Sequence, residues 1–407
     1  MIENAIRARL PLIGAYTSDT VNVAHVLKAY SGATFNCWSA KSKASYTALG
    51  KGASWYAFIN EGDTVDMEKV YQLLSENAGC MVLINPPPHP LVVNTGTLPT
   101  PRVLVENMLS EVVGEDELSS VINALGGLTL KEISEVAGMA SHMYGEVTPE
   151  SLIKVRKVMA PSTSGLYPVD TSYDYFMVPE DLSDWIELNR PFFINPVEPR
   201  LVPRGLLMLG PPGTGKTMAA KHLSHKLEVP LYRLDLGSLM GKYVGESEGN
   251  LSNALGTVDR MAPCIMLIDE IEKLFKNSDD GGVVRRLLSQ LLWWLQEHQS
   301  VVLTVMTTND SSGIPPELYR RQRVDKNIEF MPLSSLQEIR TLVLETIKAT
   351  MGTTSLGKVG KKGLAELTSA IMENISSKED SGGDGVSHSV VVSTTYTEIK
   401  RWLLTKS

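Results

Sequence analysis

The sequence predicts an α/β protein that contains two parallel sheets. Apolar runs alternate with helical patterns in both halves of the chain, as in strand–helix–strand units. In the second half, a glycine-rich loop stands directly between an apolar run and a helical pattern. Each alternating segment is followed by a stretch that reads as helices alone, so we expect a helical part after each sheet.

Composition is typical of a soluble globular protein. The chain has 407 residues, of which 43% are hydrophobic and 21% charged, and its net charge is −8. Neither half is basic, which argues against a large nucleic-acid surface. No apolar run approaches the roughly 20 residues needed to span a bilayer. The start of the chain does not read as a signal peptide, and three separated cysteines fit a reducing compartment, so we expect a cytoplasmic protein.

The first unit is predicted to be a small α/β domain over residues 1–102 with helices behind it. The expected strands are 10–16, 55–60 and 79–85, and the expected helices are 21–30 and 64–77. Residues 103–159 read mostly as helices and predict a helical subdomain. Residues 160–180 are a linker by composition.

The second unit is predicted to be a larger α/β subdomain over residues 181–332, followed by a helical lid over 333–407. The expected strands are 205–210, 231–236, 264–270 and 300–309. The expected helices are 216–227, 247–261, 283–297 and 334–350. Because parallel strands deliver their carboxyl ends to one crevice, the residues that follow these strands are the candidates for a ligand site.

The stretch "LLMLGPPGTGKTMAAKHL", 206–223, joins a strand, a glycine loop and a helix without a break. The spacing of Gly210, Gly215, Lys216 and Thr217 matches a phosphate-binding loop (P-loop). In such a loop the lysine reaches the β and γ phosphates and the hydroxyl binds Mg²⁺. We therefore expect ATP with Mg²⁺ here, rather than an ordinary Gly-rich turn. The predicted nucleotide-binding residues are Gly210, Pro211, Pro212, Gly213, Thr214, Gly215, Lys216, Thr217 and Met218.

Two acids end the apolar strand in "CIMLIDEIEKLF", 264–275. We expect Asp269 to hold Mg²⁺ and Glu270 to orient and polarise the attacking water. The alternative is a solvated acidic strand end, which the preceding phosphate loop makes the weaker interpretation. The next strand ends in Asn309, whose amide could hydrogen-bond the γ phosphate and the water, although asparagine also ends strands for purely structural reasons.

A basic cluster in "PPELYRRQRVDKNIEF", 315–330, contains Arg320, Arg321 and Arg323. An arginine supplied by a neighbouring subunit can neutralise charge in the transition state of phosphoryl transfer. On spacing alone, a solvated cluster that pairs with Glu317 and Asp325 is the better interpretation.

The order of "GPPGTGKT", "IMLIDE", "TTN" and "LYRRQRVD" resembles that of the AAA family of ATPases, and "GKYVGESE" resembles the pore loop of AAA proteins such as katanin and spastin. This resemblance implies a P-loop NTPase fold with a helical lid and a homo-oligomeric ring, usually a hexamer. It also implies that Tyr243, flanked by Lys242 and Val244, projects into the central channel and grips an extended polypeptide. Otherwise, Tyr243 would pack against its own helix.

A closer resemblance is to the uncharacterised AAA ATPases encoded in cyanobacterial and plastid genomes. It implies that residues 1–102 form a degenerate P-loop-like domain. Here "GAYTSD" lacks the glycine–lysine pair and "LIN", 83–85, lacks the acids, so this domain should not hydrolyse ATP.

The resemblance also suggests roles for Asn309 and for the three arginines. It makes Asn309 the first sensor, and it matches Arg320 and Arg323 to the family's arginine pair, with Arg321 as a further candidate to act in trans. There are departures: residues 176–188 lack the usual adenine-holding stretch, and the lid turn carries His388.

Three functions remain open at this stage. The first is an ATP-driven ring that remodels or threads a protein substrate with Tyr243. The second is a nucleic-acid-acting motor or loader, which the acidic charge balance disfavours. The third is a switch that assembles with ATP and recruits partners without translocation.

Overall fold

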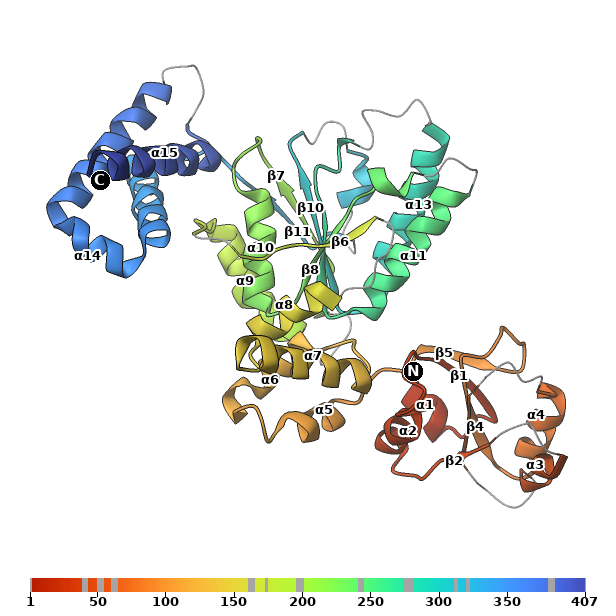
Figure 1. The fold of residues 1–407 in the computed structure, drawn as a ribbon. Coiled ribbons are helices and arrows are strands. Elements are labelled where there is room, and N and C mark those ends of the chain that lie inside the picture. Colours follow the sequence, from red (N-terminus) through yellow and green to blue (C-terminus); the bar gives the residue numbers. More distant parts are fainter. Residues whose placement is uncertain are drawn as a thin grey trace. The chain divides into compact units, whose positions relative to one another are not determined.

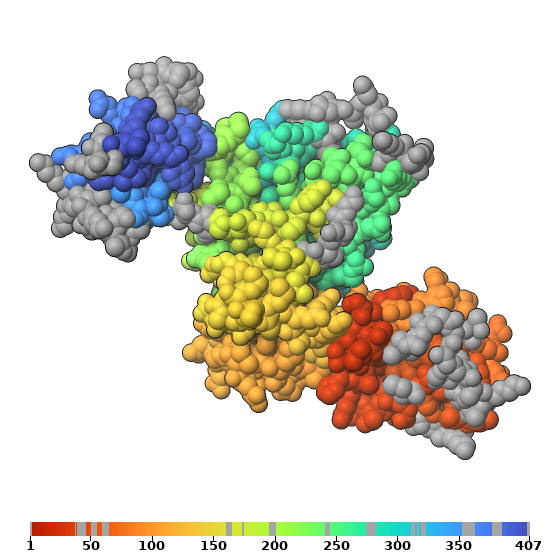
Figure 2. Space-filling model, viewed as in Figure 1, coloured from red at the N-terminus to blue at the C-terminus, as the bar shows by residue number. Residues whose placement is uncertain are grey.

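A computed structural model describes residues 2–38, 43–49, 55–59, 65–159, 165–172, 175–194, 201–240, 245–273, 281–310, 314–319, 323–379 and 385–406. The chain divides into unit 1, Met1–Met159, and unit 2, Ala160–Ser407. Figure 1 shows the elements of each unit, and Figure 2 shows their surfaces, with the residues outside the description in grey. The predicted α/β class is confirmed, since each unit contains a mainly parallel sheet with helices.

Unit 1 begins with a five-stranded sheet of order β2-β3-β4-β1-β5, in which all paired strands are parallel. Its strands are β1 Leu12–Tyr16, β2 Asn36–Cys37, β3 Trp55–Ile59, β4 Cys80–Ile84 and β5 Val93–Thr97. Its helices are α1 Ile2–Arg7, α2 Val23–Ser31, α3 Lys43–Ala48 and α4 Met67–Glu76. Strand β4 is buried along its whole length, as expected for an apolar strand inside a parallel sheet.

Four helices complete unit 1. They are α5 Arg102–Leu109, α6 Glu115–Ala124, α7 Leu130–Tyr144 and α8 Pro149–Met159. Helix α7 begins with a capping box, in which Thr129 accepts from the Glu132 backbone N–H and the Glu132 side chain accepts from the Thr129 backbone N–H. These helices have their own apolar core.

Unit 2 contains a six-stranded sheet of order β11-β7-β10-β9-β8-β6. Its strands are β6 Leu166–Pro168, β7 Gly205–Leu209, β8 Leu231–Leu234, β9 Cys264–Ile268, β10 Val302–Thr308 and β11 Lys326–Glu329. The helices of the same part are α9 Glu180–Ile194, α10 Lys216–Leu227, α11 Glu246–Arg260 and α13 Gly281–Glu297. Helices α11 and α13 pack with one apolar cluster and α9 and α10 with another, on opposite faces of the sheet (Figure 1).

The segment predicted as a linker, 160–180, is more than a connection. Within it, β6 pairs antiparallel with β8 and adds an edge strand to an otherwise parallel sheet. A single antiparallel edge strand is common in sheets of this kind, and three residues carry too little pattern to reveal it in the sequence.

Most of the described residues of the lid are helical. It consists of α14 Leu336–Glu379 and α15 His388–Lys406, which share an apolar core. The helix predicted over 334–350 therefore continues well beyond its expected end. Just before α15, Val386 forms an isolated bridge with Leu333, so that the start of α15 returns to the end of the sheet.

The two sheets have the same order of parallel strands once β6, the antiparallel edge strand of unit 2, is set aside. When the parallel strands of each sheet are numbered along the chain, the first lies between the fourth and the fifth, and the third and second follow the fourth. Strand β4 therefore corresponds to β10, and β3 to β9. The comparison of "LIN", 83–85, with the acid-bearing strand was wrong, because these residues end the counterpart of β10. The residues that follow β3, 60–64, lie outside the described part of the chain.

Candidate functional site

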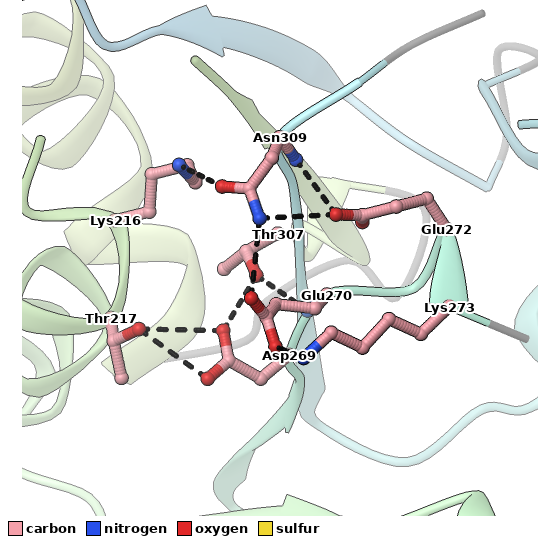
Figure 3. A network of polar contacts seen from close by, with 8 residues as sticks. All are labelled: Lys216, Thr217, Asp269, Glu270, Glu272, Lys273, Thr307 and Asn309. Carbon is pink, nitrogen blue, oxygen red and sulfur yellow. Dashed lines mark hydrogen bonds and ion pairs between the residues drawn. The ribbon is translucent and has the colours of Figure 1, made fainter. Parts of the chain in front are cut away.

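Three neighbouring strand ends build the candidate site in unit 2 (Figure 3). Strand β10 lies between β7 and β9, with Thr308 beside Leu209 and Met306 beside Ile268. The next residue along each strand therefore reaches the same edge. In this way the register brings the glycine loop, the two acids and Asn309 together.

The glycine loop depends on its first residue. Gly210 has φ 147°, and a Cβ there would lie 2.1 Å from the Phe330 carbonyl oxygen, so only glycine fits. Pro211, Pro212 and Gly213 are exposed. The Thr214 hydroxyl donates to the Pro211 carbonyl at 2.9 Å and stabilises the turn.

Lys216, the first residue of α10, points back under this loop and is only 6% exposed. Its ammonium donates to the carbonyl oxygens of Gly210 and Pro211 at 2.6 and 2.8 Å, and to Asn309 Oδ1 at 2.9 Å. Burial lowers the pKa of Lys216, while Glu272 and the other nearby acids act in the opposite direction. The ammonium thus holds the carbonyl oxygens of the loop and the Asn309 amide together.

Asp269 and Glu270 follow β9 and have different partners. Asp269 Oδ1 accepts from the Thr307 hydroxyl at 2.6 Å, and the Thr217 hydroxyl lies 3.3 and 3.5 Å from its two oxygens. Glu270 pairs with Lys273. That contact is the main reason why the pKa of Glu270 is lowered.

Asn309 is held between the acids and the lysine. Its Nδ2 donates to Glu270 Oε1 at 3.2 Å and to Glu272 Oε1 at 3.1 Å, and its backbone N–H also donates to Glu272 Oε1 at 3.1 Å. Glu272 is only 3% exposed. An amide NH₂ has two hydrogens, so both are engaged here and the orientation of the amide is fixed.

The oxygen donors fit a magnesium ion. The Thr217 hydroxyl and the Asp269 carboxylate are hard ligands on one side of the site. Mg²⁺ keeps several waters and binds proteins through one or two carboxylates plus substrate phosphates. The described residues contain no group of three or more His, Cys, Asp or Glu side chains that could hold a metal ion.

The comparisons with known proteins agree with this geometry. Residues 206–332 match the family described as "ATPase family associated with various cellular activities (AAA)". The chain contains an AAA domain. Its sheet and glycine loop accordingly have the P-loop NTPase fold.

Proteins of two kinds are among those similar to this chain. The "Uncharacterized AAA domain-containing protein ycf46" of Guillardia theta is 32% identical over 58% of this chain and 48% of its own length. The protein of the same name from Gracilaria tenuistipitata var. liui is 37% identical over 42% of this chain and 36% of its own length. The "26S proteasome regulatory subunit 6B homolog" of Saccharomyces cerevisiae is 32% identical over 37% of this chain and 36% of its own length. The chain thus spans about half the length of the Guillardia theta relative and about a third of the length of the other two.

Of the residues predicted from the sequence, Lys216, Thr217, Asp269, Glu270 and Asn309 lie together in the AAA domain. Arg323 turns to its own subunit, where it donates to the Glu317 carbonyl at 2.7 Å and to Gln296 Oε1 at 3.2 Å. Met218 is partly buried against the core beneath the loop. The predicted residues Lys242, Tyr243, Val244, Arg320 and Arg321 lie outside the described part of the chain.

Sequence reasoning missed Thr307, Glu272 and Lys273. Glu272 and Lys273 follow the two acids directly, so their proximity could have drawn attention to them. The hydroxyl of Thr307 gives no such signal, because threonine is common in strands for its shape alone.

A cluster of rings lies beside the phosphate loop. Phe176 lies 3.0 Å from where a Cβ on Gly215 would stand, and its ring lies 5.7 Å from that of His222 and 6.1 Å from that of His388. His222 is 8% exposed and packs within its own chain. Its burial lowers its pKa to about 4.

The lid reaches the phosphate loop directly. The Ser389 backbone N–H donates to the Gly213 carbonyl at 2.9 Å, which connects the first turn of α15 to the loop. A conformational change in the phosphate loop can therefore be transmitted to the lid through this hydrogen bond.

None of the helices in the described part of the chain combines the length and apolar character needed to cross a bilayer.

Proposed function

We propose that this protein hydrolyses ATP at the site formed by the phosphate loop, the two acids and Asn309. The observation that carries the proposal is the hydrogen-bonded network in which Lys216, Asn309 and Glu270 meet at one edge of the sheet. Each of these side chains is of the type that phosphoryl transfer requires at that place. Catalysis would consist of positioning and charge neutralisation, without a covalent intermediate.

Each residue has a defined task in this proposal. Lys216 exchanges the carbonyl oxygens of its own loop for phosphate oxygens. Thr217 and Asp269 hold Mg²⁺, which supplies positive charge to the phosphates. Glu270 orients and polarises the attacking water, and Asn309 fixes that water against the γ phosphate.

We further propose that the protein acts as a ring, with six subunits as the expected number. A neighbouring arginine would complete the site. Because Arg323 is bonded to Glu317 and Gln296 of its own chain, Arg320 is the stronger candidate to reach across, with Arg321 as the alternative.

The substrate that we propose is a polypeptide gripped by the loop that carries Lys242, Tyr243 and Val244. In support, relatives named as proteasome regulatory subunits match 36% and 37% of this chain. The net charge of −8 is also unfavourable for a nucleic-acid motor.

The first experiment uses Glu270→Gln. We expect the variant to bind ATP with wild-type affinity and to lose hydrolysis by roughly a hundredfold or more. Size-exclusion chromatography with light scattering, with and without ATP, then reports the assembly. A monomer at saturating ATP, in a wild-type protein that hydrolyses at full rate, contradicts the ring.

The second experiment uses Tyr243→Ala and separates three functions. A threading ring keeps its basal ATPase and loses work on an unfolded model protein. Unchanged remodelling by the variant contradicts the gripping role of Tyr243, and a wild-type protein that assembles with ATP but remodels nothing favours an assembly switch. Stimulation of the wild-type ATPase by DNA or RNA, lost as salt is raised, favours a nucleic-acid motor.

A further inference from the structure

Thr307 lies at the point where β10 meets the acidic turn after β9. The register places Met306 beside Ile268, so Thr307 and Asp269 follow at the same level. The Thr307 side chain is fully buried, with 0% exposure. A buried hydroxyl needs hydrogen-bond partners, and both acids supply them.

A single hydroxyl connects the two acids (Figure 3). Thr307 Oγ1 donates to Asp269 Oδ1 at 2.6 Å and accepts from the Glu270 backbone N–H at 2.8 Å. The Thr307 carbonyl also accepts from the Ile271 N–H at 3.0 Å. Three bonds to one residue therefore fix the whole turn.

That turn is strained at the residue proposed to act on water. Glu270 has φ 53°, a left-handed conformation that residues other than glycine seldom adopt. Such a conformation persists only when its surroundings fix it. The bonds from Thr307 to the Glu270 and Ile271 N–H groups are the contacts that do so.

We propose that Thr307 is a positioning residue for both acids. Its hydroxyl anchors Asp269 Oδ1, so that the carboxylate faces the Thr217 hydroxyl as a ready-made half of the metal site. Its bond to the Glu270 N–H holds the left-handed turn that directs the glutamate. The proposal rests on the proposed nucleotide site. Within that site, it makes Thr307 the residue that sets the orientation of both acids.

The test compares three substitutions on one strand. Thr307→Val keeps the shape and removes the hydroxyl, and Thr307→Ser restores it. Thr308→Val is the matched control, because Thr308 is equally buried and its hydroxyl donates to the Asp310 carbonyl and accepts from the Asp310 N–H. Thr307→Ala takes the place of valine should that variant not fold.

The readouts are nucleotide affinity in Mg²⁺ and in EDTA, kcat and KM. In Thr307→Val we expect the gain in ADP affinity due to Mg²⁺ to shrink roughly ten- to hundredfold, with affinity in EDTA unchanged. We expect kcat to fall by a similar factor while KM changes less. Thr307→Ser and Thr308→Val should stay within about twofold of wild type.

The possible outcomes distinguish a failure of the positioning role from a failure of the proposed function. Mg²⁺-dependent affinity and kcat that survive in Thr307→Val overturn the positioning role alone. A wild-type chain that binds no nucleotide in either condition overturns the proposed function instead. An equal loss of affinity in Mg²⁺ and in EDTA also contradicts the proposal, because it indicates general damage to the fold.

Discussion

The parallel strands of the two sheets have the same order, but within the described residues only the sheet of unit 2 ends in a recognisable candidate nucleotide site. In unit 2, β7 leads through 210–215 into α10. In unit 1, β1 leads through the equally long loop 17–22 into α2. The loop of unit 2 delivers Lys216 to its helix, whereas the corresponding first residue of α2 is Val23.

The loop of unit 1 contains its own anion. Asp19 is 5% exposed, and its carboxylate accepts from the Asn22 backbone and side chain at 3.2 and 2.7 Å. It also accepts from the Lys131 N–H at 3.1 Å, at the start of α7. A helix N-terminus favours a negative charge. The carboxylate thus stabilises the loop and connects it to the helical part of unit 1.

The asparagines after the corresponding strands β4 and β10 are also used differently. Asn309 joins Lys216 to the acids. Asn85 instead pairs with the backbone of Thr17, accepting from its N–H at 3.0 Å and donating to its carbonyl at 2.9 Å. The same strand order therefore supports two arrangements. In unit 2 the asparagine bonds to charged side chains, and in unit 1 it bonds to the backbone of its own loop.

The largest effect expected from this difference is on nucleotide binding. Lys216→Met should weaken ATP binding by roughly a hundredfold or more, because the phosphates lose their main side-chain cation. Lys221→Met, on the same helix, is the control and should bind normally. The measurement is titration with a fluorescent ATP analogue. Binding that persists in Lys216→Met places the nucleotide elsewhere, and unit 1 would then need re-examination.

A second effect should appear in the stability of unit 1. Asp19→Ala removes three hydrogen bonds to a carboxylate and leaves the Lys131 N–H unpaired, so we expect a loss of about 2–3 kcal/mol in the free energy of unfolding. Denaturant unfolding of the full chain measures it. ATP affinity should not change; if it does, loop 17–22 takes part in nucleotide binding.

The sequence predicted the AAA site better than it predicted the role of unit 1. The loop at 210–217 and the acids 269–270 are local patterns whose spacing fixes their chemistry. Thr307 and Asn85 act through residues that are distant along the chain, and only the strand register brings those partners near. Strand β6 was missed for a related reason, since an edge strand of three residues is decided by its partner β8.

A paired substitution of the two asparagines sharpens the comparison. Asn309→Ala should lower kcat by roughly ten- to hundredfold, because water and γ phosphate lose a positioned amide. Asn85→Ala should leave kcat unchanged and lower the stability of unit 1 by about 1–2 kcal/mol. Steady-state ATPase assays and denaturant unfolding of both variants give the answer. Equal effects on kcat would contradict the division of roles between the sheets.

Acid should affect unit 2 through three buried histidines, His222, His298 and His388, because burial lowers the pKa of each. Burial lowers the pKa of His222 and of His298 to about 4. Both imidazoles are neutral in the folded protein. At pH values above their unfolded pKa of about 6.5, their burial therefore does not lower the free energy of unfolding. Between pH 6.5 and 4 the unfolded chain binds more protons, and stability falls.

The expected loss is on the order of 1–2 kcal/mol per histidine between pH 7 and pH 5. Denaturant unfolding at several pH values measures it, and His222→Phe should remove the part due to His222. A His222→Phe variant with an unchanged pH dependence would show that this ring is not the source.

The smallest expected effect concerns strands β4 and β10, which directly precede Asn85 and Asn309. Strand β4 is Cys-Met-Val-Leu-Ile, whereas its counterpart β10 contains Thr304, Thr307 and Thr308. Thr307 and Thr308 have partners near the site. Thr304 is 0% exposed, and its hydroxyl has no hydrogen-bond partner among the described residues.

Thr304→Val makes β10 resemble β4 at this position and removes a buried polar atom without changing the shape of the side chain. We expect unit 2 to gain about 1 kcal/mol in the free energy of unfolding, with ATPase activity unchanged. Thermal and denaturant unfolding check the gain. A loss of stability would mean that the Thr304 hydroxyl has a partner after all, such as a buried water, and that the hydroxyls of β10 are a connected feature of the catalytic sheet that β4 lacks.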